Sequence, residues 1–263
     1  MRSLLAALGL LASLPLAAQE AGRWNLDIHN TSGTLSGHYD GITSGQPFQV
    51  DLGDDLALNR SGNALGFGAE YQGPRFGLEL SVDPETFKGV NAPVRNITID
   101  GQTFAAQTQV SSRVKATTTV LNWTIRCLTF DQGWLGVDLG VRAVSMNINA
   151  SGTVQASANG VPYSTAGGVS YTGTIPLPMV GVAGGFDLLD RALVARAYYH
   201  TLDVSGASYN VAGADLRWFP VDWVGIRVFT SSAKLKIPDN SIKKNIDIAL
   251  NQAINGIGVV FQF

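Results

Sequence analysis

The chain is dominated by a two-residue alternation of apolar side chains with glycine or polar ones, repeated between clusters of turn residues. In the segment 134–142 the alternation pairs Leu135, Val137, Leu139 and Val141 with Gly136, Asp138, Gly140 and Arg142. The same pattern recurs in 62–71, 75–83, 191–203, 212–218, 223–230 and 256–263. Successive side chains of a β-strand point to opposite faces. Each segment is therefore predicted to be a strand with one apolar face and one face of small and charged residues.

The composition limits what such strands can build. Hydrophobic residues make up 45% of the chain, charged residues 14%, and the formal net charge is -2. This balance offers no basic face for nucleic acid and carries less charge than a typical soluble surface. No segment comes near the roughly 20 consecutive apolar residues of a membrane helix. Since a closed barrel is the other structure that satisfies the backbone inside a bilayer, a transmembrane barrel is predicted.

Less regular strands near 23–37, 112–126 and 173–187 raise the strand count to about ten. The predicted fold is all-β, a closed antiparallel transmembrane β-barrel of about ten strands, with about eight or twelve as the alternatives. Pro176 and Pro178 lack backbone donors, which places the start of 173–187 in a loop, a bulge or the rim.

The connections alternate between short and long ones along the chain. The short ones lie at 72–74, 130–133, 188–190 and 219–222, and the long ones at 38–61, 87–111, 150–171 and 237–249. The connection 204–208 takes the place of a long one in this alternation, although it is itself short. Bacterial barrels combine short periplasmic turns with longer, polar outer loops.

The aromatic residues are expected to form two interfacial girdles. All five tryptophans (Trp24, Trp123, Trp134, Trp218 and Trp223) fall near the short turns. Tyrosines such as Tyr199 and Tyr209 fall toward the long connections.

The N-terminal residues have the three parts of a signal peptide. A positive start at Arg2 is followed by an apolar run from Leu4 to Leu16 and by small residues at Ala17 and Ala18. Residues 1–18 are therefore predicted to be cleaved on export, and 19–263 to form one barrel domain in the outer membrane. Cys127 is the one cysteine, so an internal disulfide is excluded.

Strand parity gathers acidic and basic residues in equal number on the face that would line the lumen. They are Glu70, Glu79, Asp83, Asp138 and Asp215, with Arg126, Arg142, Arg196, Arg217 and Arg227. Buried charges persist when they are paired and hydrogen-bonded. The favoured interpretation is a salt-bridge plug that fills a narrow barrel. The alternative is a small polar conduit whose charges select or gate a solute.

Other chemistry has little support in the sequence. His200 and Asp203 lie near the predicted rim as candidates for a hydrolase or acyltransferase site, but no nucleophile elbow or other catalytic spacing accompanies them. The histidines are scattered, without the spacing of a zinc site. Asp51, Asp54 and Asp55 lack the ordered oxygen ligands of a calcium loop and are expected to form a turn. We predict no catalytic site, no cofactor and no metal site.

The C-terminal residues 255–263 resemble the terminal strand by which outer-membrane barrels are recognised for insertion. Gly258, Phe261 and Phe263 carry the resemblance, while Gly256 stands where a polar residue is usual. Most of the mature chain resembles a poorly characterised family of small outer-membrane barrels, broadly similar to OmpA-type and OmpW-type barrels. The segments that carry this likeness are 50–56, 99–104, 176–178 and 216–220. The resemblance implies the fold and the outer-membrane location, and no known activity.

The sequence thus predicts a non-enzymatic outer-membrane barrel that is structural or binds a ligand through its outer loops. A narrow channel for small solutes is the first alternative, and a rim-site hydrolase or acyltransferase acting on lipid or peptide is the second. The expected partners are outer-membrane lipid, lipopolysaccharide and, during insertion, the barrel-assembly machinery. An unidentified ligand at the outer loops is a further candidate, and nucleic acid is not expected.

Overall fold

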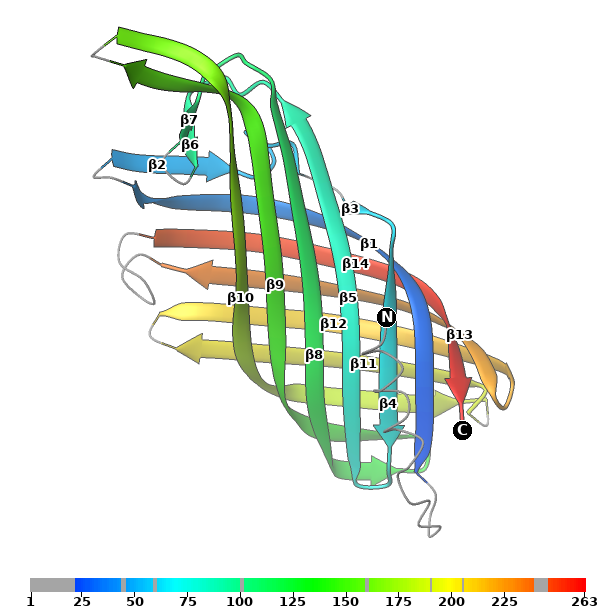
Figure 1. The fold of residues 1–263 in the computed structure, drawn as a ribbon. Helices are drawn as coiled ribbons and strands as arrows, with labels where there is room; N and C mark the ends of the chain where they lie inside the picture. Colours follow the sequence, from blue (N-terminus) through cyan, green and yellow to red (C-terminus); the bar gives the residue numbers. More distant parts are fainter. Residues whose placement is uncertain are drawn as a thin grey trace.

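Ten strands close into one antiparallel barrel in the computed structural model of the chain (Figure 1). They are β1 (Arg23–Thr43), β4 (Ala64–Gln72), β5 (Phe76–Asn91), β8 (Val110–Phe130), β9 (Gly133–Ala158), β10 (Val161–Leu188), β11 (Leu193–Val204), β12 (Ala207–Val221), β13 (Val224–Ile237) and β14 (Ile246–Gln262). The ring runs β10-β11-β12-β13-β14-β1-β4-β5-β8-β9, and β9 pairs again with β10. The predicted all-β class and ten strands are confirmed, and the alternatives with fewer or more strands are wrong.

The structure describes residues 22–43, 46–58, 61–99, 102–158, 161–189, 191–204, 206–238 and 246–263. The expected signal segment 1–18 lies outside these residues. Among the described residues, four short strands join the sheet at one end of the barrel: β2 (Gln46–Asp51), β3 (Ser61–Gly62), β6 (Ile97–Ile99) and β7 (Gln102–Phe104). Within the described ranges, no helix has the length and apolar character needed to cross a membrane.

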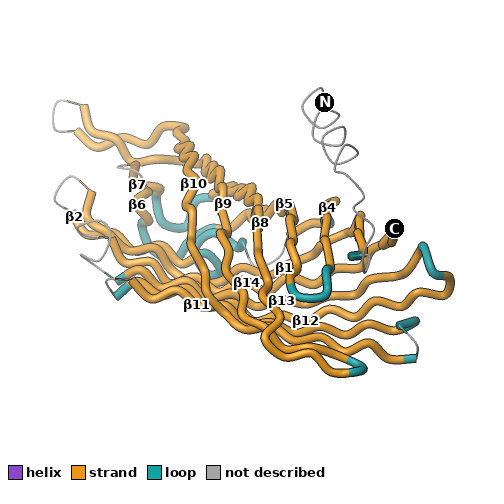
Figure 2. The backbone as a smooth tube through the Cα atoms, turned by 90° about the horizontal axis from the view of Figure 1, so that it is seen from below, coloured by secondary structure: helices purple, strands orange, loops and turns teal. Residues whose placement is uncertain are grey.

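The short connections gather at the other end of the barrel. The start of β1 and the end of β14 also meet there. The Trp24 N–H donates to the Phe263 carbonyl at 3.1 Å, and the Phe263 N–H donates to the Trp24 carbonyl at 2.9 Å. Seen from below, β5, β8, β9 and β10 form one wall and β11 to β14 the facing wall (Figure 2). The two walls face each other across the interior of the barrel.

An apolar belt covers the outside of the barrel next to the short turns. Its exposed members include Phe76, Leu78 and Leu80 on β5, Leu121, Trp123 and Ile125 on β8, Leu135, Val137, Leu139 and Val141 on β9, Ile226 and Val228 on β13, and Ile257 and Val259 on β14. Contiguous apolar surface of this extent is unfavourable in water and favourable against lipid tails. The alternation in the sequence thus turns the apolar face of each strand outward.

Glycines on the inner face leave room for the charged side chains of the neighbouring strand. Gly66 lies opposite His29, and Gly68 lies opposite Asp27, in the ladder between β1 and β4. A Cβ at Gly66 would lie 2.2 Å from His29 Nε2, and one at Gly68 would lie 1.9 Å from Asp27 Oδ2. Both distances are far inside van der Waals contact, so a larger residue would displace the charged side chain. The face of glycine and charge is therefore the lumen of a narrow barrel.

Pro176 and Pro178 lie within the continuous strand β10, so a loop or a bulge at this place is wrong, whereas the rim, the third place expected for them, agrees with the structure. Pro176 pairs with Ala143 and Pro178 with Val141 in the ladder with β9. Among the described residues, β11 joins β10 only from Val180 onward. The prolines therefore occupy a stretch of β10 with a free edge, where a strand tolerates a missing N–H donor.

The long outer segments also differ from the polar outer loops expected of them. β9 and β10 continue through 150–158 and 161–171 as one long hairpin. Residues of 50–58, together with Ile97 and Phe104, pack against the inner faces of β5, β8 and β9, and Ser112 Oγ donates to the Leu56 carbonyl at 2.8 Å. The buried residues of this region, here called the outer apolar cluster, are Leu35, Val50, Leu56, Leu58, Phe87, Ile97, Phe104, Val110, Val114, Ala116, Ala150 and Val154.

Two aromatic side chains expected in the girdles point into the barrel instead. Trp123 and Trp223 are exposed, whereas Trp134 and Tyr209 are buried. Trp134 shares its strand face with Asp138, which lies four positions further along β9. The expectation for Trp134 and Tyr209 is wrong because strand parity, and not height along the barrel axis, decides which way a side chain points.

An arginine on the apolar belt should be far more destabilising than one beyond it. Leu139→Arg places a charge against lipid tails, which costs about 2–4 kcal/mol near the bilayer midplane. Ser151→Arg lies on the same face of β9 but above the belt, and its effect on the free energy of unfolding should stay within about 0.5 kcal/mol. Urea unfolding in lipid vesicles measures both values. Equal losses would mean that Leu139 does not face lipid.

Candidate functional site

The lumen holds a layer of charged side chains between the short turns and the outer apolar cluster. The residues that form ion pairs or hydrogen bonds with one another are Asp27, His29, Glu70, Asp83, Asp138, Arg196, His200, Asp215, Arg217 and Arg227, here called the charged layer. They come from β1, β4, β5, β9, β11, β12 and β13, and alternation along each strand turns them inward. Residues distant in the sequence therefore meet in one polar layer.

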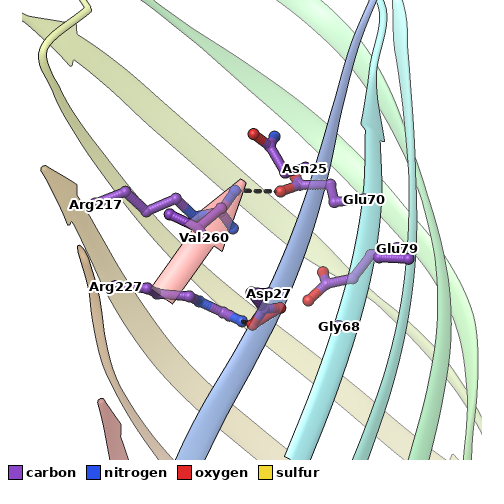
Figure 3. A pocket seen from close by; sticks show the side chains of 9 residues that line it. Asn25, Asp27, Gly68, Glu70, Glu79, Arg217, Arg227 and Val260 are labelled. Atoms are coloured by element: carbon purple, nitrogen blue, oxygen red, sulfur yellow. Dashed lines mark hydrogen bonds and ion pairs between the residues drawn. The ribbon is translucent and has the colours of Figure 1, made fainter. Parts of the chain in front are cut away.

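Glu70 is the centre of the layer because it joins opposite walls of the barrel. Nη1 of Arg196 donates to Glu70 Oε1, and Nη1 of Arg217 donates to Glu70 Oε2. In the ring of ten strands, β11 with Arg196 stands five strands from β4 with Glu70 by either route. Figure 3 shows Arg217 reaching Glu70 from the facing wall. The Arg196–Glu70 pair thus spans the lumen.

Asp215 and Asp27 extend this set of ion pairs around the wall. Arg217 Nε donates to Asp215 Oδ1 at 2.9 Å. Arg227 Nη1 donates to Asp27 Oδ1 at 2.6 Å, and Arg227 Nη2 lies 3.6 Å from Asp215 Oδ2. Charge-assisted bonds of this kind are about twice as strong as neutral ones. They connect β12, β13 and β1 from the inside of the barrel.

His29 lies between two carboxylates. Its Nδ1 is 2.8 Å from Asp27 Oδ1, and its Nε2 is 2.6 Å from Asp83 Oδ1. Each ring nitrogen has to donate to a carboxylate oxygen, which requires the positively charged imidazolium. Ser81 Oγ donates to the second oxygen of Asp83 at 3.1 Å. His29 therefore adds a cation to the lumen beside the arginines.

His200 pairs with Asp138 inside the barrel. Its Nε2 lies 2.8 Å from Asp138 Oδ2, and both residues are buried. Asp203, the partner considered from the sequence, is exposed further along β11. The rim pair of His200 with Asp203 is thus wrong, because the inward face of β11 at His200 meets β9 across β10.

Three residues of the predicted lumen set stand apart from these pairs. Within the described part of the chain, Glu79, Arg126 and Arg142 form no salt bridge. Arg126 lies 4.8 Å from the centre of the Trp134 ring, a cation–π contact. Arg142 lies 6.0 Å from the centre of the Tyr209 ring. Glu79 lies directly opposite Glu70 in the ladder between β4 and β5.

Sequence reasoning missed Asp27 and His29, although the signal was present. In 24–29, Trp24, Leu26 and Ile28 alternate with Asn25, Asp27 and His29. Treating 23–37 as an irregular strand left these side chains without an assigned face. The parity used for the other strands places both in the lumen.

Two small cavities lie within the charged layer. One of about 10 Å³ is lined by Asp27, Glu70, Glu79, Arg217 and Arg227 among others (Figure 3). The second, of about 50 Å³, lies among residues that include His29, Asp138, Arg142 and His200. Its polar atoms without a hydrogen-bond partner among the described residues are Asn122 Oδ1, Asp138 Oδ1, Arg142 Nε, His200 Nδ1 and Arg227 Nε. A space of this size accommodates about four water molecules, far fewer than an aqueous channel.

The acidic residues of the first outer segment form a turn. Asp51 Oδ1 accepts hydrogen bonds from the N–H groups of Gly53 at 2.8 Å and Asp54 at 2.7 Å. Asp55 Oδ2 accepts from the Asp51 N–H and from Arg95 Nη2, each at 2.9 Å. In the part of the chain that the structure describes, no group of three or more His, Cys, Asp or Glu is arranged to hold a metal ion.

Gly258 and Phe261 lie in β14, the strand that closes the barrel between β1 and β13, and Phe263 follows at its end. Gly258 is opposite His29, and a Cβ there would lie 2.5 Å from His29 Cβ. Phe263 is largely exposed. The role of these residues as an insertion signal stays a prediction.

The chain has the fold of an outer-membrane β-barrel. It is similar to the outer membrane protease OmpT of Escherichia coli, with a TM-score of 0.66, 12% sequence identity, and 95% of this chain and 100% of that chain covered. This match confirms the expected fold. The translocator domain of the autotransporter NalP of Neisseria meningitidis gives a TM-score of 0.44 at 13% identity, covering 98% of this chain and 97% of that chain. Ail, the attachment invasion locus protein of Yersinia pestis, gives 0.37 at 11% identity, covering 92% and 99%. No protein-family model matches the chain, and no curated protein matches its sequence.

Removing the charge of Glu70 should destabilise the barrel, whereas removing the charge of Glu79 should not. Glu70→Gln leaves two buried arginines facing a neutral amide and should destabilise the barrel by about 3–5 kcal/mol. Glu79→Gln removes the repulsion between the Glu79 carboxylate and that of Glu70, which lies directly opposite on the adjacent strand. It should therefore be neutral or stabilising by up to about 1 kcal/mol. Free energies of unfolding in lipid vesicles measure both effects. A larger loss for Glu79→Gln would contradict the central position of Glu70.

Proposed function

We propose that the chain is a non-enzymatic barrel of the outer membrane whose lumen is closed by the charged layer, so that its outer surface performs a structural or ligand-binding role. The ion pair between Arg196 and Glu70 carries the proposal. A pair that joins strands five apart in a ring of ten occupies the middle of the lumen. In an open pore, water would separate the two walls at this height.

The energetics of burial support a closed lumen. The side chains of Arg196 and Glu70 are 8% and 9% exposed, and that of Arg217 is 4% exposed. Removing one member of a buried ion pair costs about 3–5 kcal/mol, because the remaining charge has no solvent to replace its partner. Glu70 binds two arginines at once, so a path through this point requires both pairs to separate. A solute that fits into the lumen without binding these charged groups would not supply the energy needed to separate the two pairs.

The outer apolar cluster supports closure from the other end. Phe87, Ile97 and Phe104 are fully buried there. Residues 56–57 cross the inner face of β5 so closely that a Cβ at Gly89 would lie 1.9 Å from the Leu56 carbonyl oxygen. A solute that entered from this end would meet close-packed apolar side chains before it reached the charged layer.

The burial of the histidines argues against catalysis in the lumen. OmpT is described as a protease, so catalysis is the natural question for a chain of this fold. His29 and His200 both contact carboxylates, but they are 1% and 4% exposed. A general base has to come within hydrogen-bond reach of its substrate. In this proposal both histidines stabilise the plug.

A narrow conduit is the competing function, and the cavity of about 50 Å³ is the observation in its favour. Unpartnered polar atoms such as Arg142 Nε and His200 Nδ1 line it. Water or a small ion would satisfy such atoms, and fixed charges of both signs are the means by which narrow pores select their solutes.

Export and insertion follow from the ends of the chain in this proposal. Residues 1–18 direct export, and the barrel-assembly machinery recognises β14 through Gly258, Phe261 and Phe263. Lipid of the outer membrane, including lipopolysaccharide, then surrounds the apolar belt.

Planar-bilayer recording on the refolded full chain separates the plug from the conduit. We expect no steady current from the native barrel, because paired charges fill the lumen. Arg196→Gln should lower the free energy of unfolding by about 3–5 kcal/mol, whereas Arg75→Gln in an exposed short turn should change it by less than about 0.5 kcal/mol. The shift of the gel band on heating establishes that each variant is folded before recording.

A conduit would give a different recording. A steady native current whose ion selectivity changes in Arg196→Gln, and is unchanged in Arg75→Gln, would refute the plug and establish the conduit.

A further inference from the structure

A hollow of about 580 Å³ lies on the outer wall of the barrel, where β5, β8, β9 and β10 continue beyond the apolar belt. Figure 1 shows these strands side by side on one wall of the barrel. Lys88, Arg113, Asn149 and Ser170 form one row across the hollow, because Lys88 pairs with Arg113, Arg113 with Asn149, and Asn149 with Ser170. One strand face thus presents a continuous line of cationic and polar side chains.

The cations of this wall have no acidic partner in the described part of the chain. Lys88 and Arg113 are direct cross-strand neighbours, and Lys115 lies two positions from Arg113 on the same face of β8. None of the three forms a salt bridge with a described residue. Like charges directly opposite each other destabilise a sheet. An anion from outside the chain would relieve that repulsion.

The surrounding wall is uncharged rather than acidic. Above the belt, the described outward side chains of the four strands include no Asp or Glu. They are mainly small and polar, and include Ser111, Thr117, Ser145, Asn147, Ser151, Thr172 and Thr174. The nearest acids of β5, Asp83 and Glu85, belong to the opposite strand face and contact His29 and Gln252 inside the barrel. The hollow is therefore selective for negative charge.

Amide and hydroxyl groups flank the cations. Asn147 Nδ2 donates to Thr172 Oγ1 at 3.0 Å, and Ser145 Oγ lies 2.9 Å from Thr174 Oγ1. Such groups both donate and accept hydrogen bonds, which suits sugar hydroxyls. Lysine and arginine, by contrast, are the residues that pair with phosphate. The combination fits a phosphorylated sugar better than a bare phosphate.

The height of the hollow fits the polar part of the outer leaflet. The outward residues of β8 pass from Leu121 in the belt through Thr119 and Thr117 to Lys115 and Arg113. At about 3.4 Å per residue and a strand tilt near 40°, the two cations stand roughly 15–20 Å above Leu121. That height is beyond the acyl chains, in the region of headgroups and attached sugars.

We propose that this hollow binds the phosphorylated sugar headgroup of an outer-leaflet glycolipid, of the kind that lipopolysaccharide provides. Lys88, Arg113 and Lys115 bind its phosphate groups, and Asn147 and Asn149 bind the sugar. The site is on the opposite face of the barrel wall from the charged layer. It therefore does not depend on whether the lumen is closed.

The test compares two double variants of the full chain in detergent micelles by their affinity for purified lipopolysaccharide. Lys88→Gln with Arg113→Gln removes two charges from the hollow. Lys234→Gln with Lys236→Gln is the matched control, because it removes two exposed charges from β13, outside the hollow. We expect binding about ten- to thirtyfold weaker for the first variant, and a change within about twofold for the control. Heat-modifiability on gels establishes that both variants are folded.

Two outcomes of this comparison would overturn the proposal. Equal losses in the two variants would mean that binding follows total charge rather than the hollow. No measurable binding of lipopolysaccharide to the native chain would mean that the hollow holds no such ligand.

Two further probes identify the source of the phosphate. With lipopolysaccharide that a phosphatase has dephosphorylated, the native chain and the variant of Lys88 and Arg113 should bind equally. Inorganic phosphate at the same concentration should not compete with the glycolipid. A difference that survives dephosphorylation, or competition by inorganic phosphate alone, would overturn the assignment to a phosphorylated glycolipid headgroup.

Discussion

Closure of the strand ladder is the constraint on which the rest of this structure depends. Inside hydrocarbon, every backbone N–H and C=O has to find its partner within the protein. β14 meets this demand by pairing with β1 on one side and β13 on the other, and β9 pairs with β8 and β10. Once ten strands close the ring, the lumen is too narrow for a wide aqueous channel. Side chains have to fill it, and they have to satisfy one another.

The distribution of glycine and charge follows from filling this lumen. At some positions a glycine on the neighbouring strand leaves room for a large polar side chain that projects inward, as Gly66 does beside His29 and Gly68 beside Asp27. Where an arginine crosses the lumen, it meets a carboxylate from a distant strand, as Arg196 meets Glu70. On the outer face of the same wall, the character of the side chains matches the surrounding medium instead. It is apolar along the belt, and above the belt it carries Lys88 and neighbouring cations that the environment has to neutralise.

The alternation in the sequence predicts the strand face on which each charged side chain lies, but it does not predict the residue with which that side chain forms an ion pair. Alternation tells which face Glu70 and Arg196 occupy. That they pair with each other depends on the number of strands and on the stagger of the closed ladder, which is a property of the whole ring. His200 meets Asp138 two strands away, and not Asp203 on its own strand, for the same reason. Trp134 is a different case, because the sequence already places it on the same strand face as Asp138, and nearness to a short turn does not decide which way a side chain points.

A double-mutant cycle on Arg196 and Glu70 tests the closed lumen most directly. Free energies of unfolding in lipid vesicles for Arg196→Ala, Glu70→Ala and the double variant give the coupling energy between the two residues. Since the pair joins opposite walls of the barrel, we expect a coupling of about 1.5 kcal/mol or more. Effects that add to within about 0.5 kcal/mol would show that the two side chains do not meet, and would contradict a plug across the lumen.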